Sequence, residues 1–361
     1  MLSERTSVGL DVHARSVVGC AIDGEAGEIR TKRLPGQTEQ VLAWVLSLPG
    51  PVAVAYEAGP TGFGLARALS AAGVRCEVVA PSKLERPPGD KVKTDRRDAE
   101  RLARLLRIGE LPAVRVPTET EEAARDLVRA REDARGDLMR ARHRLSKLLL
   151  RQGLIWDATA WTAAHEQWLR GHHFKRRGVA LAYDEALDAV YTVRARRDRL
   201  DTAIVEMAAE PQFVGPVGRL CCLRGISTLT ALGLCVEVAD WRRFTGSTIG
   251  AYLGLVPAEY SSGDRRAQGS ITKAGNSHAR RLLVESSWQH RRPLRPSVVR
   301  ARRADGQPAV VRERAEQGNR RLHQRWARLE GRHKRPTIAA VAVARELAGW
   351  CWSLATLEPT G

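Results

Sequence analysis

Four acidic residues stand where a carboxylate needs a specific role. Asp11 lies in the apolar run VGLDV, where a lone carboxylate is costly to bury unless it is paired or binds a cation. Glu57 ends a second apolar run, PVAVAYE. Asp95 and Asp98 are three residues apart in a helical pattern, so both point from one helix face. Four converging carboxylates can hold two cations about 3.5–4 Å apart for phosphodiester chemistry. We therefore expect a site for Mg²⁺, which prefers oxygen ligands and keeps several waters.

Each acid also has a simpler explanation. Asp95 and Asp98 would be favoured near a helix N-terminus by the helix dipole alone. Asp11 could accept a hydrogen bond from a backbone N–H, and Glu57 could cap the following helix. The joint pattern favours a metal site: one acid in the first strand, one after the fourth, and a DxxD at the last helix.

The composition indicates a polyanionic partner. The 361 residues include 59 Lys and Arg against 41 acids, a formal net charge of +18. Basic residues recur along the chain from Arg5 to Arg335 and beyond, which fits nucleic acid better than one amphipathic membrane helix. Basic residues beside the DxxD could hold a phosphate backbone, although a solvated helix face is the simpler alternative. These candidates are Lys91, Lys93, Arg96 and Arg97.

Nothing in the sequence indicates a membrane protein. No apolar run approaches the roughly 20 residues of a membrane span, and the segment MLSERTSVGLDVH has no signal-peptide core. The cysteines form no CxxC pair, which favours reduced thiols. We expect a cytoplasmic location.

The first 115 residues alternate strand and helix patterns. Three strands are expected at 8–12, 16–22 and 28–34. Helix, strand, helix, strand, a polar loop and a last helix then follow, and Thr94 is a plausible N-cap for that last helix. This is the element order of a ribonuclease-H-like (RuvC-like) α/β domain, expected over residues 1–115.

Residues 116–210 are expected to form a coiled-coil helical hairpin. Two long helical patterns carry apolar seams and together favour an antiparallel pair that could serve as a spacer or dimerising arm. The first seam comprises Leu127, Ala134, Leu138, Ala141, Leu145 and Leu148. The second comprises Leu187, Val190, Val193, Leu200, Ile204 and Met207. The intervening histidines are interpreted as surface or RNA-facing residues: His165, His172 and His173.

Residues 211–361 are expected to form a mostly α-helical C-terminal domain. The prolines of PQFVGP should break the helical pattern, and TIAAVAVARELAGWCWSLA should form a closing apolar helix. LRGISTLTALGL resembles a helix-hairpin-helix, a motif that binds backbone phosphates, but Ser227 stands where a second glycine is usual.

Several motifs resemble one family. GLDVH, YEAGPTGFGL and KTDRRDAERLARLL are similar to the N-terminal motifs of the DEDD transposases of insertion sequences. That group includes the Piv-type DNA invertases and the bridge-RNA-guided recombinases. AYLGLVPAEYSSG and GSITKAGNSHARRLL resemble the family's C-terminal domain. The resemblance covers nearly the whole chain, with both motif sets in the right order.

The resemblance implies roles for particular residues. Asp11, Glu57, Asp95 and Asp98 fall on the four metal-binding acids, and Ser262 falls on the nucleophilic serine, with Ser261 next to it as the alternative. It further implies a covalent phosphoserine in strand cleavage. Dimers or tetramers would have one subunit's acids complete the site around another's serine. A structured RNA from the element's ends would choose donor and target DNA.

The serine assignment is also chemically reasonable. A serine hydroxyl is a weak nucleophile until it is activated, and no His/Asp pair is spaced nearby, so a metal site from another domain is a reasonable activator. Without the resemblance, the SSG sequence would be interpreted as a plain turn. Basic residues that could clamp the scissile phosphate follow the serine: Arg265, Arg266, Lys273, Arg280 and Arg281.

Three other functions compete with a transposase. A Holliday-junction-type nuclease would use the same acids with water in place of serine. A nucleic-acid-binding protein with a decayed nuclease fold would not need all four acids. An actin-like sugar kinase would need glycine-rich phosphate loops, which we do not find. We therefore expect a DNA-recombining enzyme that uses a two-metal site and a serine.

Overall fold

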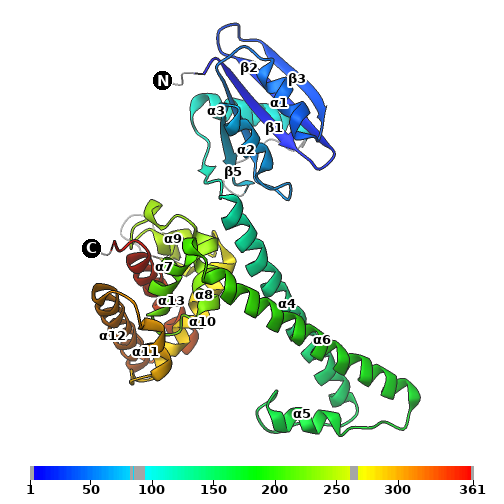
Figure 1. Ribbon diagram of the computed structural model, residues 1–361, viewed down its shortest axis with the longest axis vertical. Helices are drawn as coiled ribbons and strands as arrows, with labels where there is room; N and C mark the ends of the chain where they lie inside the picture. The colour runs from blue at the N-terminus through cyan, green and yellow to red at the C-terminus, as the bar shows by residue number, and fades with distance from the viewer. Residues whose placement is uncertain (1–3, 82–83, 85–93, 261–266, 359–361) are drawn as a thin grey trace. The chain divides into compact units, whose positions relative to one another are not determined.

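The computed structural model describes residues 4–81, 84, 94–260 and 267–358. Figure 1 shows the chain, which divides into two compact units, Met1–Thr118 and Glu119–Gly361. The first unit is an α/β unit with a mixed β-sheet and the second is mostly helical, as the sequence predicted. The boundary lies close to the expected domain end at residue 115.

A six-stranded sheet in the order β3-β2-β1-β4-β5-β6 forms the centre of the first unit. β1 pairs antiparallel with β2 and parallel with β4, so β1 lies inside the sheet. β2 pairs antiparallel with β3, β4 parallel with β5, and β5 antiparallel with β6. The strands are β1 (Thr6–Val12), β2 (Ser16–Asp23), β3 (Ile29–Pro35), β4 (Val52–Glu57), β5 (Arg75–Val79) and the short β6 (Ala113–Val114), which the sequence did not predict.

Helices cover both faces of this sheet. The helices are α1 (Thr38–Leu46), α2 (Gly64–Ala71) and α3 (Asp95–Ile108). α1 and α2 bury Trp44 and Leu69 against Leu10 and Tyr56 in one cluster. Side chains alternate between the two faces of a strand, and the other face carries α3, where Ala99 packs with residues of β2. The expected order of strands and helices is therefore observed.

Helix α3 begins where the sequence predicted. The hydroxyl of Thr94 accepts a hydrogen bond from the backbone N–H of Arg97 at 3.3 Å, which satisfies one of the free donors of the first turn. The apolar side of the helix is buried through Leu102 and Leu106. Asp95 and Asp98 lie in the first turn of α3, and α3 packs against β1.

The second unit begins with a helical hairpin. Its helices are α4 (Glu119–Arg151), α5 (Ala163–Arg170) and α6 (Arg177–Ala208). α4 and α6 lie side by side, joined by the ion pair of Arg131 with Asp201 at 2.6 Å. Leu145 and Leu148 of the first predicted seam are buried with Val190 of the second, so both seams face the hairpin core.

The rest of the second unit is a helical body around one core. Its elements are α7 (Pro211–Cys221), α8 (Thr228–Val238), η2 (Trp241–Arg243), α9 (Ile249–Tyr252), β7 (Pro257–Glu259), β8 (Gln268–Ile271), α10 (Ser277–Ser287), η3 (Trp288–Arg291), α11 (Val298–Ala304), α12 (Ala309–Gly331) and α13 (Pro336–Ala355). The core includes Leu232, Leu283, Trp326 and Leu347, from four different helices.

The segment 211–216 differs from its expected role as a plain break. α6 ends at Ala208, but a new helix, α7, starts at Pro211 and continues through Pro216. Pro211 occupies the first turn, where the missing N–H would have no helical partner. The prolines therefore end one helix and start the next.

One helix of the described chain, α13, is long and apolar enough to span a membrane. Its sequence holds no unbroken apolar run of that length, because Arg345 and Glu346 interrupt it. In the structure one side of this helix, including Val343 and Leu347, is buried in the core of the second unit, while Ile338 is exposed. That burial is the role of a core helix.

Candidate active site

Two of the four predicted acids lie together in the first unit. Nε2 of His13 is 3.3 Å from Oδ2 of Asp11 and 3.8 Å from Oδ1 of Asp95. The ligand-type atoms of these three residues all lie within 4.8 Å of one another. His13 was not among the residues predicted from the sequence. Its signal was the position two residues after Asp11, which puts both side chains on one side of an extended chain.

A glycine in β1 makes this approach possible. A Cβ atom on Gly9 would overlap the carbonyl oxygen of Ala99 and lie 2.6 Å from the backbone nitrogen of Ala103, both on α3. Gly9 and Asp11 are on the same face of β1 because side chains alternate along a strand. Asp95 lies one helical turn before Ala99. Backbone contact at Gly9 thus sets Asp11 beside Asp95.

The other two acids border the same sheet edge. The negative charge of Asp98 raises the pKa of Asp11, so the two carboxylates lie near each other. Glu57 is the last residue of β4, and β4 pairs parallel with β1 in a register that sets Tyr56 opposite Leu10. Glu57 and Asp11 are the next residues along these strands and point to the same face. The four acids therefore come from adjacent strand ends and one helix start.

The surroundings of Asp11 disfavour an isolated negative charge. Burial raises the pKa of the Asp11 carboxyl, the charge of His13 lowers it, and the charges of Asp95 and Asp98 raise it further. Carboxylates held this close repel one another unless a cation lies between them. All four acids offer hard oxygen ligands, the chemistry that suits Mg²⁺. The donor set fits a divalent cation.

The predicted basic residues near the DxxD divide into two groups. Arg96 and Arg97 are exposed in the first turn of α3, beside Asp95 and Asp98. Lys91 and Lys93 lie outside the described residues. The exposed pair is thus well placed to meet a phosphate that approaches the acids.

Both candidate serines, Ser261 and Ser262, lie outside the described residues, as do Arg265 and Arg266. The strands on either side of them are described. β7 and β8 pair antiparallel, with Pro257 opposite Ile271, and the backbone N–H of Tyr260 donates to the carbonyl of Ala267 at 2.9 Å. The predicted nucleophile lies, in sequence, between these two paired strands.

Close backbone packing fixes the base of that β-hairpin. Gly275 has a φ of 66°, and a Cβ there would overlap the carbonyl oxygen of Tyr252. The backbone N–H of Lys273 donates to the carbonyl of Gly254 at 3.1 Å, and the Lys273 side chain is exposed. The guanidinium of Arg280 donates to the carbonyls of Leu253 and Ala274 at 2.9 and 2.8 Å. Arg280 therefore holds the base of the β-hairpin.

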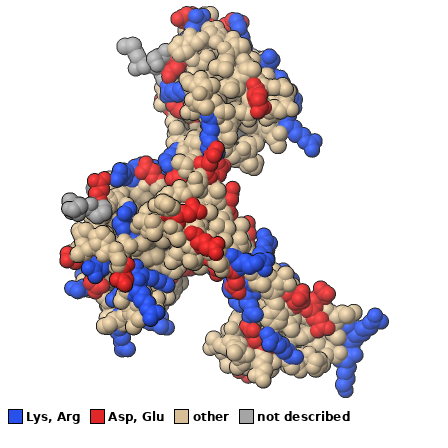
Figure 2. Space-filling model, in the orientation of Figure 1, with Lys and Arg blue, Asp and Glu red and all other residues tan. Residues whose placement is uncertain are grey.

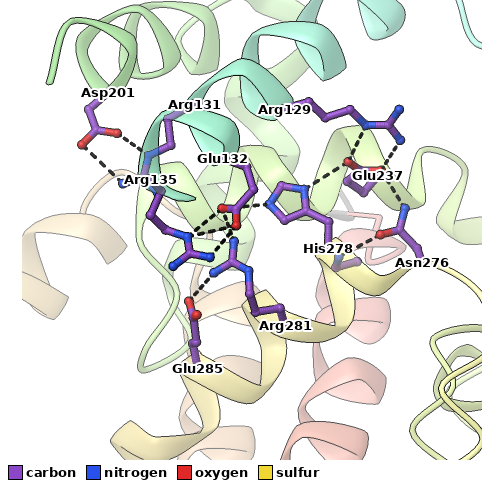
Figure 3. Close-up of polar contacts among 11 residues, drawn as sticks. Arg129, Arg131, Glu132, Arg135, Asp201, Glu237, Asn276, His278, Arg281 and Glu285 are labelled. Carbon is purple, nitrogen blue, oxygen red and sulfur yellow. Dashed lines mark hydrogen bonds and ion pairs between the residues drawn. The ribbon is translucent and has the colours of Figure 1, made fainter. Parts of the chain in front are cut away.

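A polar network joins this region to the helical hairpin (Figure 3). The buried carboxylate of Glu237 on α8 accepts from Nδ2 of Asn276 at 2.6 Å and lies 3.1 Å from Nδ1 of His278. Arg281 on α10 pairs with Glu132 on α4 and, at 2.6 Å, with Glu285. Arg281 is thus committed to internal ion pairs.

The segment that resembles a helix-hairpin-helix does form two helices and a turn. α7 and α8 are joined by residues 222–227, and Ser227 caps α8 by accepting from the N–H of Thr230. Within the turn, the N–H of Arg224 donates to Oδ1 of Asn319 at 2.8 Å, and that of Ile226 to the carbonyl of Leu223. These donors are used inside the protein, so they do not face a phosphate.

Two family models match the chain in the two regions that carry these sites. A model described as a transposase matches residues 8–154, which include the four acids. A second, described as the transposase IS116/IS110/IS902 family, matches residues 218–299, which include both serines.

Relatives align with nearly the whole chain. A putative transposase of Sinorhizobium fredii, y4qE, is 38% identical over 355 residues, covering 96% of this chain and 88% of the relative. The transposase for insertion sequence element IS1533 of Leptospira borgpetersenii is 32% identical over 343 residues, covering 92% of this chain and 99% of the relative. A probable family 20 transposase of Pseudomonas aeruginosa is 27% identical over 365 residues, covering 97% of both chains.

The two family models match the regions that contain the clustered acids and the β-hairpin. The relatives align with both regions in one chain. The chain belongs to the IS116/IS110/IS902 family of transposases, enzymes that cut and rejoin DNA.

Proposed function

We propose that this transposase cuts and rejoins DNA strands with two Mg²⁺ ions held by Asp11, Glu57, Asp95 and Asp98, and with Ser262 as the nucleophile. The observation that carries the proposal is the approach of Asp11 on β1 to Asp95 on α3 across His13. Two carboxylates from distant parts of the chain meet there, at the edge of the sheet where Glu57 also ends its strand.

The strand order supports a ribonuclease-H-like fold for the first unit. Three antiparallel strands precede α1, and β4 and β5 then pair parallel beside β1. This is the element order expected of such a domain. In that fold the catalytic acids would come from the first strand, the fourth strand and the last helix, where Asp11, Glu57 and Asp95 lie.

The acids and their neighbours have separate tasks in the proposed reaction. Bound cations would supply charge neutralisation at the attacking and departing oxygens. Asp11, Glu57, Asp95 and Asp98 would hold them, and His13 would keep the carboxylates of Asp11 and Asp95 oriented. Arg96 and Arg97 would attract the phosphate backbone toward this negative cluster.

The serine would conserve the energy of the broken DNA bond. Oγ of Ser262 attacks the scissile phosphorus and loses its proton, and the bond from phosphorus to the departing strand's oxygen breaks, so that strand leaves with a free hydroxyl. A hydroxyl of another strand can later attack the phosphoserine and release Ser262. Arg280 would position the β-hairpin that carries the serine. Its contacts with the carbonyls of Leu253 and Ala274 support that role.

We further propose that a structured RNA from the element's ends guides the enzyme, and that it works as a dimer or tetramer. The net charge of +18 supports a large nucleic-acid footprint. The long α4–α6 pair supports a division into a catalytic domain, a helical hairpin over 116–210 and a serine domain over 211–361. In that division the hairpin joins subunits.

Trapping the covalent intermediate tests this function. The protein is incubated with RNA transcribed from its flanking DNA, Mg²⁺ and a nicked suicide substrate, and denaturation-resistant adducts are mapped by mass spectrometry. We expect an adduct at Ser262 that Ser262→Ala abolishes and Ser261→Ala reduces less. An adduct that persists in Ser262→Ala would move the role to another hydroxyl. Cleavage without any adduct would favour attack by water, as in a junction-resolving nuclease.

A further inference from the structure

The second unit contains an arginine-rich surface that the proposed chemistry does not use. Residues 291–303, RRPLRPSVVRARR, carry many arginines and no acid. They include η3's last residue and most of α11, and nearly all are exposed. Figure 2 shows Lys and Arg side chains gathered over the α11 and α12 part of this unit. A dense positive surface of this kind attracts polyanions.

These arginines line a pocket of about 570 Å³ between the α7–α8 turn and α11. We call it the arginine pocket. No carboxylate belongs to its lining, as far as the chain is described. The arginines that line it are Arg224, Arg292, Arg295, Arg300 and Arg303. A volume of this size is typical of a ligand site, and its charge selects an anion.

Two of these arginines build the pocket. The guanidinium of Arg224 donates to the carbonyl oxygens of Arg292 and Pro293 at 2.7 and 3.2 Å. Arg303 donates to the carbonyl oxygen of Ile226 at 3.3 Å. These hydrogen bonds fix the 292–303 segment against the α7–α8 turn. The two segments that line the pocket are therefore held in place by the side chains of Arg224 and Arg303.

The remaining arginines face an excess of like charge. Arg292 and Arg295 are exposed, and Arg300 has Glu316 at 3.8 Å. Burial lowers the pKa of Arg224, and the charges of Arg300 and Arg292 lower it further. Mutual repulsion of this kind is relieved by a bound anion. Guanidinium groups match phosphate oxygens in geometry and charge.

The shape favours a chain of phosphates over a single small anion. A neighbouring pocket of about 330 Å³ shares Pro296, Ser297 and Arg300 with the first, so the two adjoin; its own lining adds Arg312 and also the carboxylate of Glu316. Val298 and Val299 beside it are 69% and 58% exposed. Arginines that contact phosphates next to apolar groups that contact sugars or bases are typical of strand binding. A membrane surface would need a longer amphipathic helix than the seven residues of α11.

We propose that the arginine pocket binds the phosphodiester backbone of a nucleic-acid strand, at a site separate from the four acids. The inference rests on the proposed action on nucleic acid and adds a second binding site to it. Arg292, Arg295 and Arg300 contact the phosphates, and Arg224 and Arg303 position the segment that carries them.

Equilibrium binding of the full-length protein in EDTA tests this pocket apart from catalysis. The probes are single-stranded DNA, duplex DNA and an RNA hairpin, each fluorescently labelled and titrated at several salt concentrations. Arg292→Gln with Arg295→Gln should weaken binding of at least one probe about tenfold or more. Each arginine that no longer neutralises a phosphate should lower the salt slope by about 0.7 on single strands or 0.9 on duplex DNA. The probe whose affinity falls most identifies the strand.

The matched control is Arg328→Gln with Arg332→Gln, two exposed arginines of the same unit that do not line the pocket. Circular dichroism checks that both double variants are folded. The proposed binding site would be refuted if the control variant lost as much affinity as the pocket variant. It would also be refuted if the pocket variant bound all three probes with wild-type affinity and wild-type salt slope. In that case wild-type binding and cleavage would still support the proposed function. A wild-type protein that binds none of the probes would refute both.

Discussion

Glu237 on α8 and Arg129 on α4 form a two-point ion pair, with both carboxylate oxygens 3.0 Å from guanidinium nitrogens. The Glu237 side chain is 1% exposed, and these contacts with those of His278 hold its pKa at about 2 despite its burial. We predict that Glu237→Ala destabilises the second unit by about 1–3 kcal/mol, because the partly buried His278 and Asn276 and the half-exposed Arg129 lose their charged acceptor. Thermal and urea unfolding followed by circular dichroism measure this destabilisation.

A matched change at the surface should have little effect. Glu285→Ala removes an exposed carboxylate from the same network, where it pairs with Arg281 at 2.6 Å. Exposed ion pairs contribute about 0–1 kcal/mol. If the two variants unfolded at the same midpoint, Glu237 would not be the stabilising centre of the network.

Gly9 is predicted to be essential for the acid cluster. Gly9→Ala adds a Cβ that overlaps the backbone of Ala99, so α3 must shift away from β1 and carry Asp95 with it. We expect a decrease of about 1–3 kcal/mol in stability, typical of overpacking, and a larger effect on DNA cleavage. Gly64→Ala is the control in the same unit, since its Cβ would meet nothing within 4 Å. Full cleavage by Gly9→Ala would show that this close approach does not set the acids.

His290 is predicted to make stability depend on pH. It is fully buried, and burial, aided by the charge of Arg224, lowers its pKa to about 4. In the unfolded chain the pKa is near 6.5, so the unfolded state binds the proton first as the pH falls. Stability should therefore drop between pH 6.5 and 4, by about 3 kcal/mol in total. Unfolding midpoints of the wild type and His290→Leu across this range should diverge on the acid side. Parallel curves would contradict the assignment.

Most elements of the first unit and the two long helices of the hairpin were predictable from local patterns. The alternation of strands and helices, the Thr94 cap and the two hairpin seams each depend on residues close in sequence. The acids were found because Asp11 and Glu57 interrupt apolar runs and Asp95 and Asp98 share a helix face. Gly9 carried a signal that was not used: a glycine within a strand indicates close backbone approach.

The partners of the arginines were not predictable. Arg280 and Arg281 follow the serine in sequence, which favoured phosphate binding. In the structure Arg280 binds two carbonyl oxygens, and Arg281 binds Glu132 on a helix far away in the chain. The partner of Arg281 depends on the fold bringing Glu132 of α4 close to α10, and no local spacing encodes that. The arginine pocket was likewise visible only as a basic stretch, because Arg224 comes from a distant turn.

The helical hairpin can be shortened without opening the main core. Ala124, Val128 and Ile204 near its base belong to the core of the second unit, whereas Leu145 and Tyr183 form a separate cluster. We predict that replacing residues 142–189 by a short Gly-Ser linker leaves a folded protein that no longer assembles or recombines. Light scattering coupled to size-exclusion chromatography, with the full-length protein as the control, gives the subunit number. A shortened protein that keeps the full-length assembly would refute the hairpin's role in joining subunits.

The most direct test of the account is the metal dependence of DNA strand cleavage in wild type and Asp11→Asn. The substitution removes a charged oxygen ligand and changes little volume, so folding and nucleic-acid binding should persist. Glu39→Gln, an exposed acid on α1 of the same unit, is the control. The account predicts that wild type and Glu39→Gln cleave DNA with Mg²⁺ and stop in EDTA, while Asp11→Asn does not cleave. Cleavage by Asp11→Asn, or undiminished wild-type cleavage in EDTA, would contradict it.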